Sequence, residues 1–551
     1  MSAELLRIRL EPLAVEFDVE RGTELVTALA AHGLEFPCGA SGLCGGCGVR
    51  VRSGWLPASI ADRQVFDEEE LDDGWRLACQ ARPELPLVLE CGQWRMDVLA
   101  DAASAVPAAA HTGLGVAIDL GTTTLACQLI DLATGNVLGV ETELNPQAAF
   151  GSDVMSRIRA ALSGADLTTP IRSALGAAIA RLAQGREGEI AEVLLVGNTV
   201  MHHLFCGYSV EPLAAAPFES QHLGQQLFSP ADLLIRQEKS EIAFPPFPAK
   251  DAGKDGARRQ YLVAGSIGWA LPASCTVRFA HCLGGFVGSD ILAGILAVNM
   301  HRGTELAALI DLGTNGEIAI GNRDGIVCAS TAAGPAFEAG SIRMGMRAVT
   351  GAISQVVLSG DQLHPTVIGG GEPRGLCGSG LVDAVACGLT SGAILSSGRI
   401  ADGTKQFPVA GRIVLQHSDV RELQLAKGAI AAGFQLLLKR LGAQVDDLHA
   451  IYLAGAFGNY VRISSALGIG LLDVPASLVH AAGNTALRGA KLLLAAPEPA
   501  LPPIEHFSLA ADPAFQDEFA ACMRFPDPQN QPDSASQVLP PCNPAPPVSL
   551  D

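Results

Sequence analysis

The strongest constraint on the fold is a short segment that occurs twice. GVAIDLGTTTLACQLIDLATGNV (residues 115–137) and AALIDLGTNGEIAIGNRDGIV (residues 307–327) each place Asp-Leu-Gly-Thr between two apolar runs. A strand, a loop and a second strand that recur 192 residues apart (307 against 115) predict two related lobes. We expect each lobe to contain a mixed sheet with helices on its faces.

The chemistry of the repeated tetrad favours a nucleotide site. Its glycine permits a tight hairpin, its amides and Thr hydroxyls can bind phosphate oxygens, and its aspartate can hold Mg²⁺ through water. Two such loops would hold one ATP from both sides, with Asp119 and Asp311 as catalytic residues at the metal and the attacking water. A single copy is as easily a β-turn in which Asp caps its own backbone, and the duplication favours the phosphate loop.

Other glycine-rich segments extend this hypothesis. In IYLAGAFGNY (residues 451–460) a buried-strand pattern leads into a glycine-rich turn, where Gly455 and Gly458 could let the backbone lie against adenine and ribose. Close helix packing is the alternative. Asn198 and Glu338 either reach the nucleotide or cap helices. No GxxxxGK[ST] segment is present, which excludes a P-loop ATPase.

Four cysteines near the N-terminus predict a metal centre. Cys38, Cys44 and Cys47 are separated by five and then two residues, and Cys79 follows after 31 more. Four thiolates can hold a [2Fe-2S] cluster, and the plant-type spacing differs only in a first gap of four. The spacing is closer to that of vertebrate-type and related bacterial ferredoxins, a resemblance that covers about the first 96 residues. Structural zinc is the alternative, although it usually uses two close pairs of cysteines.

The pattern around these cysteines predicts a β-grasp domain. Glycines in the loop, Gly42 among them, would let the backbone wrap the cluster with positive φ angles. Strands are expected at residues 5–10, 14–19, 48–52 and 85–90, with helices at 23–32 and 67–75.

Composition restricts the partners and the location. The net charge of −20 and the absence of a Lys/Arg-rich run argue against nucleic acid. No apolar stretch is long enough to span a membrane and no signal peptide is apparent, so we expect a cytoplasmic protein. The expected organisation is a ferredoxin domain (1–96), an Ala-rich linker (97–113), ATPase lobe 1 with insertions (114–300), ATPase lobe 2 (301–525) and a disordered Pro-rich tail (526–551).

The phosphate and adenosine motifs resemble those of the actin, heat-shock-chaperone and sugar-kinase superfamily. Together with the ferredoxin segment and with VLLVGNTVMHHLF, GFVGSDILAG, AAGPAFEAGSI and GLCGSGLVDAV, the chain resembles the reductive activators of corrinoid-dependent enzymes along nearly its full length. The resemblance implies a multidomain α+β and α/β fold, with a β-grasp ferredoxin domain before a two-lobed, actin-like (ribonuclease H-like) ATPase. It maps the nucleotide contacts to Gly121, Thr122, Thr123, Thr124, Gly313, Thr314, Asn315, Gly455 and Gly458, and the cluster ligands to Cys38, Cys44, Cys47 and Cys79.

The resemblance also implies an activity. It is ATP-dependent transfer of one electron from the [2Fe-2S] cluster to the cob(II)alamin of a partner corrinoid protein, which restores cob(I)alamin for methyl transfer. ATP, Mg²⁺ and an electron donor, which could be a ferredoxin, a flavodoxin or a reductase, are then required.

Three alternatives remain open from the sequence. One is an activator of 2-hydroxyacyl-CoA dehydratases or benzoyl-CoA reductases, another is a small-molecule kinase with an appended ferredoxin, and the third is an ATP-switched binding module with a structural cluster.

Overall fold

The computed structural model describes residues 5–11, 15–31, 34, 40, 42, 47–66, 68–91, 105–109, 112–151, 153–233, 269–348, 351–496 and 499–527. Cys38, Cys44, most of the predicted linker and nearly all of the predicted tail lie outside these ranges. Within them, no helix combines the length and the apolar character needed to cross a bilayer.

The N-terminal region forms the predicted β-grasp sheet. Its strand order is β2-β1-β5-β3-β4, in which β1 and β5 run parallel and the other pairs antiparallel. Inward-facing Ile8, Leu10, Val49 and Leu89 are fully buried and form its core. The elements are β1 (Leu5–Glu11), β2 (Val15–Glu20), α1 (Val26–Ala31), β3 (Gly48–Ser53), α2 (Ile60–Val65), α3 (Glu68–Asp72), β4 (Trp75–Leu77) and β5 (Leu87–Cys91).

One prediction in this domain is wrong. The acidic helix was expected over residues 67–75, but α3 ends at Asp72 and Trp75 opens strand β4. Trp75 pairs with Arg50 and Leu77 with Gly48, so the ladder with β3 overrides the local helical pattern. Helix α2 was not predicted, although Ser59 and Asp62 form a capping box at its start.

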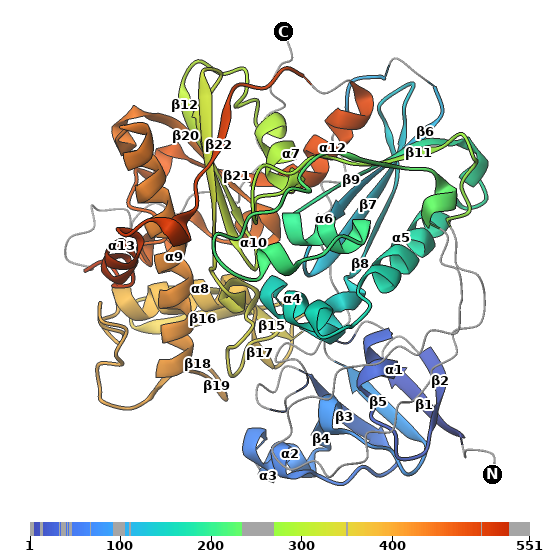
Figure 1. Ribbon diagram of the computed structural model, residues 1–551. Coiled ribbons are helices and arrows are strands. Elements are labelled where there is room, and N and C mark those ends of the chain that lie inside the picture. Colours follow the sequence, from blue (N-terminus) through green and yellow to red (C-terminus); the bar gives the residue numbers. More distant parts are fainter. Residues whose placement is uncertain are drawn as a thin grey trace. The chain divides into compact units, whose positions relative to one another are not determined.

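The first lobe contains a six-stranded sheet in the order β10-β11-β9-β6-β7-β8. Strands β6, β7 and β8 form an antiparallel meander, and β9 and β11 extend the sheet in parallel from β6. Helix α5 packs against β7 and β8 (Figure 1). The elements are β6 (Leu114–Leu120), β7 (Thr124–Asp131), β8 (Val137–Leu144), α4 (Val154–Leu162), α5 (Thr168–Ala183), β9 (Ile190–Gly197), α6 (Thr199–Cys206), β10 (Gln226–Phe228) and β11 (Thr276–Phe279). Helix α7 (Ser289–Ala297) follows, and from Ile291 onward it belongs to the second compact unit.

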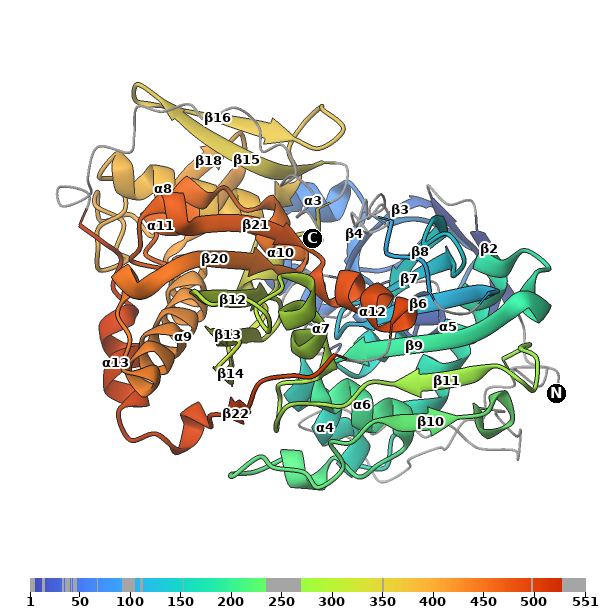
Figure 2. The same ribbon diagram turned by 90° about the horizontal axis from the view of Figure 1, so that it is seen from above.

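The second lobe repeats this topology. Its main sheet has the order β21-β20-β12-β13-β14-β22, with β12, β13 and β14 antiparallel and with β20 and β21 parallel to β12. Helix α9 packs against β13 and β14 (Figure 2). The elements of the sheet and its helices are β12 (Leu306–Leu312), β13 (Gly316–Asn322), β14 (Gly325–Thr331), α8 (Gly378–Thr390), α9 (His417–Leu441), β20 (Leu448–Ala454), α10 (Gly455–Tyr460), α11 (Ile463–Gly468), β21 (Val479–Gly483), α12 (Thr485–Ala495), β22 (Ile504–His506) and α13 (Phe515–Cys522).

Two small sheets complete the second lobe. They have the orders β16-β15-β17 and β18-β19. Their strands are β15 (Ala352–Ser359), β16 (Gln362–Val367), β17 (Gly375–Leu376), β18 (Gln406–Ala410) and β19 (Ile413–Gln416).

The two six-stranded sheets share one arrangement of strands. The order β11-β9-β6-β7-β8 corresponds to β21-β20-β12-β13-β14, with the same parallel and antiparallel pairs in each. Three antiparallel strands followed by two parallel ones form the ribonuclease H-like sheet that the duplication predicted. The fold class is therefore confirmed.

Candidate cluster and nucleotide sites

Two of the four predicted cluster cysteines lie among the described residues, on neighbouring chain segments. Cys47 precedes β3, Cys79 follows β4, and the backbone N–H of Ala78 donates to the carbonyl of Cys47 at 3.0 Å. Both cysteines are buried, with exposed fractions of 1% and 5%. Asp62 braces the same corner, because its Oδ1 accepts the N–H of Leu77 at 2.6 Å.

The loop that carries the other cysteines is described at residues 40 and 42. Ala40 and Gly42 have φ angles of 63° and 78°, so this part of the loop uses the left-handed backbone that the glycine content predicted. Two buried thiols on adjacent segments beside such a loop fit cysteine ligation of an iron–sulfur cluster.

The first predicted phosphate loop is a tight hairpin between β6 and β7. The N–H of Gly121 donates to the carbonyl of Thr124 at 3.1 Å, and a Cβ at Gly121 would lie 2.6 Å from that oxygen. Only glycine therefore fits at this position. Asn145, which directly follows β8, stabilises the hairpin by donating its backbone N–H to the Thr123 carbonyl and its Nδ2 to the Gly121 carbonyl, both at 2.9 Å.

Asn198 joins this hairpin to helix α6. Its Oδ1 accepts the N–H of Met201 at 3.0 Å, which caps the helix, while its Nδ2 donates to Thr122 Oγ1 at 2.9 Å. The helix-capping interpretation of Asn198 is therefore confirmed, and the same side chain also contacts the predicted phosphate loop. Asn145 was missed by the sequence analysis, although the Asn-Pro pair that it begins is a turn signal.

The second predicted phosphate loop joins β12 to β13 in the other lobe. The N–H of Gly313 donates to the carbonyl of Asn315 at 3.1 Å, and the buried Thr314 donates its hydroxyl to Glu338 Oε1 at 3.0 Å. Asp311 stands directly opposite Glu317 in the antiparallel ladder. Glu317 Oε1 also accepts the Ser330 hydroxyl at 3.2 Å, and among the described residues no group of three or more His, Cys, Asp or Glu side chains is placed to hold a metal ion.

The two hairpins differ at the position opposite the aspartate. Asp119 on β6 pairs with Ala126, whereas Asp311 pairs with Glu317. Glu317 was missed by the sequence analysis, although a symmetric hairpin about residues 313–315 would have placed it opposite Asp311. An acidic residue therefore stands opposite the aspartate in the second hairpin and not in the first.

The predicted adenosine segment lies against the second phosphate loop. Gly455 has a φ of 84°, and a Cβ there would stand 2.4 Å from Asp311 Oδ1 and 2.9 Å from the Leu312 carbonyl. The parallel pairing of β20 with β12, which aligns Ala454 with Asp311, creates this contact. The space that a side chain would need at Gly455 is filled by these atoms of the second loop, so glycine is required for the close packing of the two segments.

The chain after Gly455 folds as the short helix α10, so the glycine-rich turn expected there is a helical turn. Phe457 of α10 packs against Phe337, with ring centroids 4.8 Å apart, beside the 3₁₀ turn η6 (Pro335–Glu338). The turn that carries Glu338 is thereby fixed next to the second loop. At Gly458 an added Cβ would come no closer than 3.2 Å to the Leu453 carbonyl carbon.

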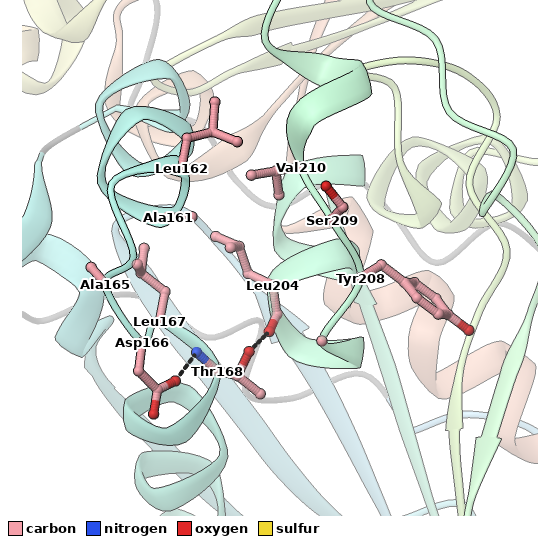
Figure 3. A pocket seen from close by; sticks show the side chains of 11 residues that line it. Ala161, Leu162, Ala165, Asp166, Leu167, Thr168, Leu204, Tyr208, Ser209 and Val210 are labelled. Atoms are coloured by element: carbon pink, nitrogen blue, oxygen red, sulfur yellow. Dashed lines mark hydrogen bonds between the residues drawn. The ribbon is translucent and has the colours of Figure 1, made fainter. Parts of the chain in front are cut away.

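A pocket of about 240 Å³ lies elsewhere in the first lobe, where the end of α4 meets the start of α5 and the end of α6 (Figure 3). Thr168 lines this pocket and donates its hydroxyl to the carbonyl of Leu204, another lining residue, at 2.7 Å. Of the described residues that line this pocket, none belongs to the predicted cluster or nucleotide sites.

Comparison with known proteins matches three stretches of the chain to family models. Residues 8–84 match the 2Fe-2S iron-sulfur cluster binding domain, residues 114–256 the RACo middle region, and residues 305–535 the C-terminal domain of RACo, the ASKHA domain.

Relatives of known role align over most of their length. The corrinoid activation enzyme RamQ of Eubacterium limosum is 34% identical over 453 residues, which are 75% of this chain and 70% of that protein. The Co(II) methylated amine-specific corrinoid protein reductase of Methanosarcina barkeri is 27% identical over 406 residues, or 69% of each chain. The solved structure of a reductive activator for a corrinoid, iron-sulfur protein is 25% identical, covers 95% of this chain and 98% of its own, and superimposes with a TM-score of 0.62. The chain thus belongs to the family of reductive activators of corrinoid proteins.

Proposed function

We propose that this chain is an ATP-dependent activator that passes one electron to the cob(II)alamin of a partner corrinoid protein and restores cob(I)alamin. The observation that carries the proposal is the union, in one member of this family, of a ferredoxin-type domain with two hairpins of identical topology. A dehydratase activator or a small-molecule kinase would not account for the relatives' shared action on corrinoid proteins.

Cys38, Cys44, Cys47 and Cys79 would hold the [2Fe-2S] cluster, whose chemistry is the acceptance and release of single electrons. The buried position of Cys47 and Cys79 excludes water from that side of the site. The electron donor would be a ferredoxin, a flavodoxin or a reductase. We place the activity in the cytoplasm, because a reducing compartment keeps such thiols free of disulfides.

Both hairpins would contribute to the binding and hydrolysis of ATP. Gly121, Thr122, Thr123 and Thr124 would bind phosphate oxygens in the first lobe, with Thr122 oriented by Asn198. Gly313, Thr314 and Asn315 would do so in the second. Asp119 and Asp311 would orient Mg²⁺ and the attacking water, and the segment that carries Gly455 and Gly458 would contact adenosine.

ATP is needed because of the energy of the electron transfer. Plant-type clusters have reduction potentials of about −400 mV. For the transfer of one electron, each difference of about 59 mV between donor and acceptor potentials changes the equilibrium constant about tenfold. Cob(II)alamin is harder still to reduce. Binding of ATP would couple to the corrinoid partner and favour the transfer of the electron, and hydrolysis would release the complex.

The test is an anaerobic mixture of this protein, a corrinoid protein and a low-potential reductant, followed by the absorbance of cob(I)alamin. We expect its formation to require ATP and to fail with Asp311→Asn, which keeps the size of the side chain but removes its charge. Cob(I)alamin that forms equally well without ATP would contradict the coupling.

A further inference from the structure

The side chain of Gln80 connects the fourth cluster cysteine to the loop that carries the first three. Its Nε2 donates to the carbonyl of Ala40 at 3.2 Å and to Cys79 Sγ at 3.5 Å. A primary amide has two N–H groups, so both hydrogen bonds can form together. This is a side-chain N–H aimed at the sulfur of a predicted cluster ligand.

Both the amide and its acceptors are held in place. Ala40 is buried and left-handed, and a Cβ on the left-handed Gly42 would lie 3.1 Å from Gln80 Nε2, so the loop backbone closes directly on the amide. On the other side, Gln80 ends the turn η1 (Ala78–Gln80), which the Ala78–Cys47 hydrogen bond ties to the start of β3. The amide therefore bridges two chain segments and is half-buried between them.

We infer that Gln80 is a positioning residue that sets the reduction potential of the cluster by donating an N–H to the ligand sulfur of Cys79. The inference rests on the proposed function, since it takes Cys79 to be a cluster ligand. Reduction adds negative charge to the cluster and its sulfurs, and a hydrogen-bond donor stabilises the more negative state more strongly. Gln80 therefore makes the cluster easier to reduce by its electron donor. It also lowers the driving force for the next step, the transfer of the electron from the cluster to cobalt.

The same amide also fixes the loop, and the two roles have different signatures. A brace to the Ala40 carbonyl alone would alter cluster retention and leave the potential of a retained cluster unchanged. A donor to sulfur shifts the potential while iron content stays constant.

The test is Gln80→Met, which keeps an unbranched side chain of the same length and removes both donors. In the anaerobic full-length protein we expect about two irons per chain, as in the unchanged protein. At a fixed solution potential we expect the ratio of reduced to oxidised cluster to fall about tenfold, a shift of about 59 mV to more negative values. The matched control is Gln64→Met, at an exposed position on α2, which should leave the potential unchanged.

An intact cluster with an unshifted potential in Gln80→Met would overturn the inference. If that variant loses its cluster, pulsed EPR of the unsubstituted protein, reduced and labelled with ¹⁵N in its glutamine side-chain amides, tests whether an amide N–H is hydrogen-bonded to the cluster. A ¹⁵N coupling that Gln64→Met retains supports the donor role, and its absence from the natural sequence overturns it.

The measurements use neither ATP nor a corrinoid protein, so they do not depend on activation. A preparation that binds no iron would overturn the proposed function and this inference together. An iron-loaded protein without the potential shift overturns only the inference.

Discussion

Replacing Gly455 by alanine tests whether the contact between the adenosine segment and the second phosphate loop serves ATP chemistry. The added methyl group would stand 2.4 Å from Asp311 Oδ1, while ordinary contact begins at 3.4 Å. The carboxylate must therefore move by about 1 Å, and a misplacement of about 1 Å in a catalytic site can cost about 10²-fold in rate. We expect kcat for ATP hydrolysis to fall about a hundredfold.

The substitution also has a backbone cost, which a matched control isolates. Gly442 closes helix α9 with a φ of 67°, and a methyl group added there would have no atom within 4 Å, so Gly442→Ala meets only the left-handed penalty. That penalty is about 1–2 kcal/mol and lowers the Tm by roughly 2–4 °C per kcal/mol for a domain of about 150–250 residues.

Steady-state ATPase assays and thermal unfolding of both variants give the answer. We expect a larger loss of Tm in Gly455→Ala, because its methyl group also meets the Leu312 carbonyl at 2.9 Å, and a loss of ATP hydrolysis in that variant alone. Hydrolysis at the natural rate in Gly455→Ala would refute the placement of Asp311 at the reacting phosphate, because its carboxylate cannot stay where it is.

Three further substitutions test other parts of the molecule. Asn198→Asp keeps the helix cap but cannot donate to Thr122, so KM for ATP should rise with stability nearly unchanged, whereas Asn198→Ala should also cost about 1 kcal/mol in chemical denaturation. Burial lowers the pKa of Lys427 from 10.5 to about 8, so the unfolded chain binds more protons between these values. The free energy of unfolding, relative to Lys427→Met, should therefore rise between about pH 8 and about pH 10.5 in urea titrations, and a flat difference would contradict this burial effect. Cys79→Ser should abolish the visible absorbance and the iron content of about two per chain, while Cys522→Ser should keep both; a zinc-loaded natural protein would refute the cluster.

The duplicated hairpins could be predicted because their contacts are local. Asp119 and Gly121 lie within a few residues of the strand with which they pair. The residues that close the turn, Gly121 and Thr124, belong to the same short segment. The β-grasp strands could be predicted for the same reason. Where a local signal competed with a ladder, as at Trp75, the local pattern predicted the wrong element.

The sequence by itself thus determined the two hairpins, the spacing of the cluster cysteines and the kind of chemistry that these residue types support. Only the tertiary structure decided which distant segments meet them. Gly455 reaches Asp311 through the parallel pairing of β20 with β12, and Gln80 reaches Ala40 across the cysteine loop. Parallel pairing and loop closure join residues far apart in the chain, so neither leaves a periodicity or a spacing that a local pattern could reveal.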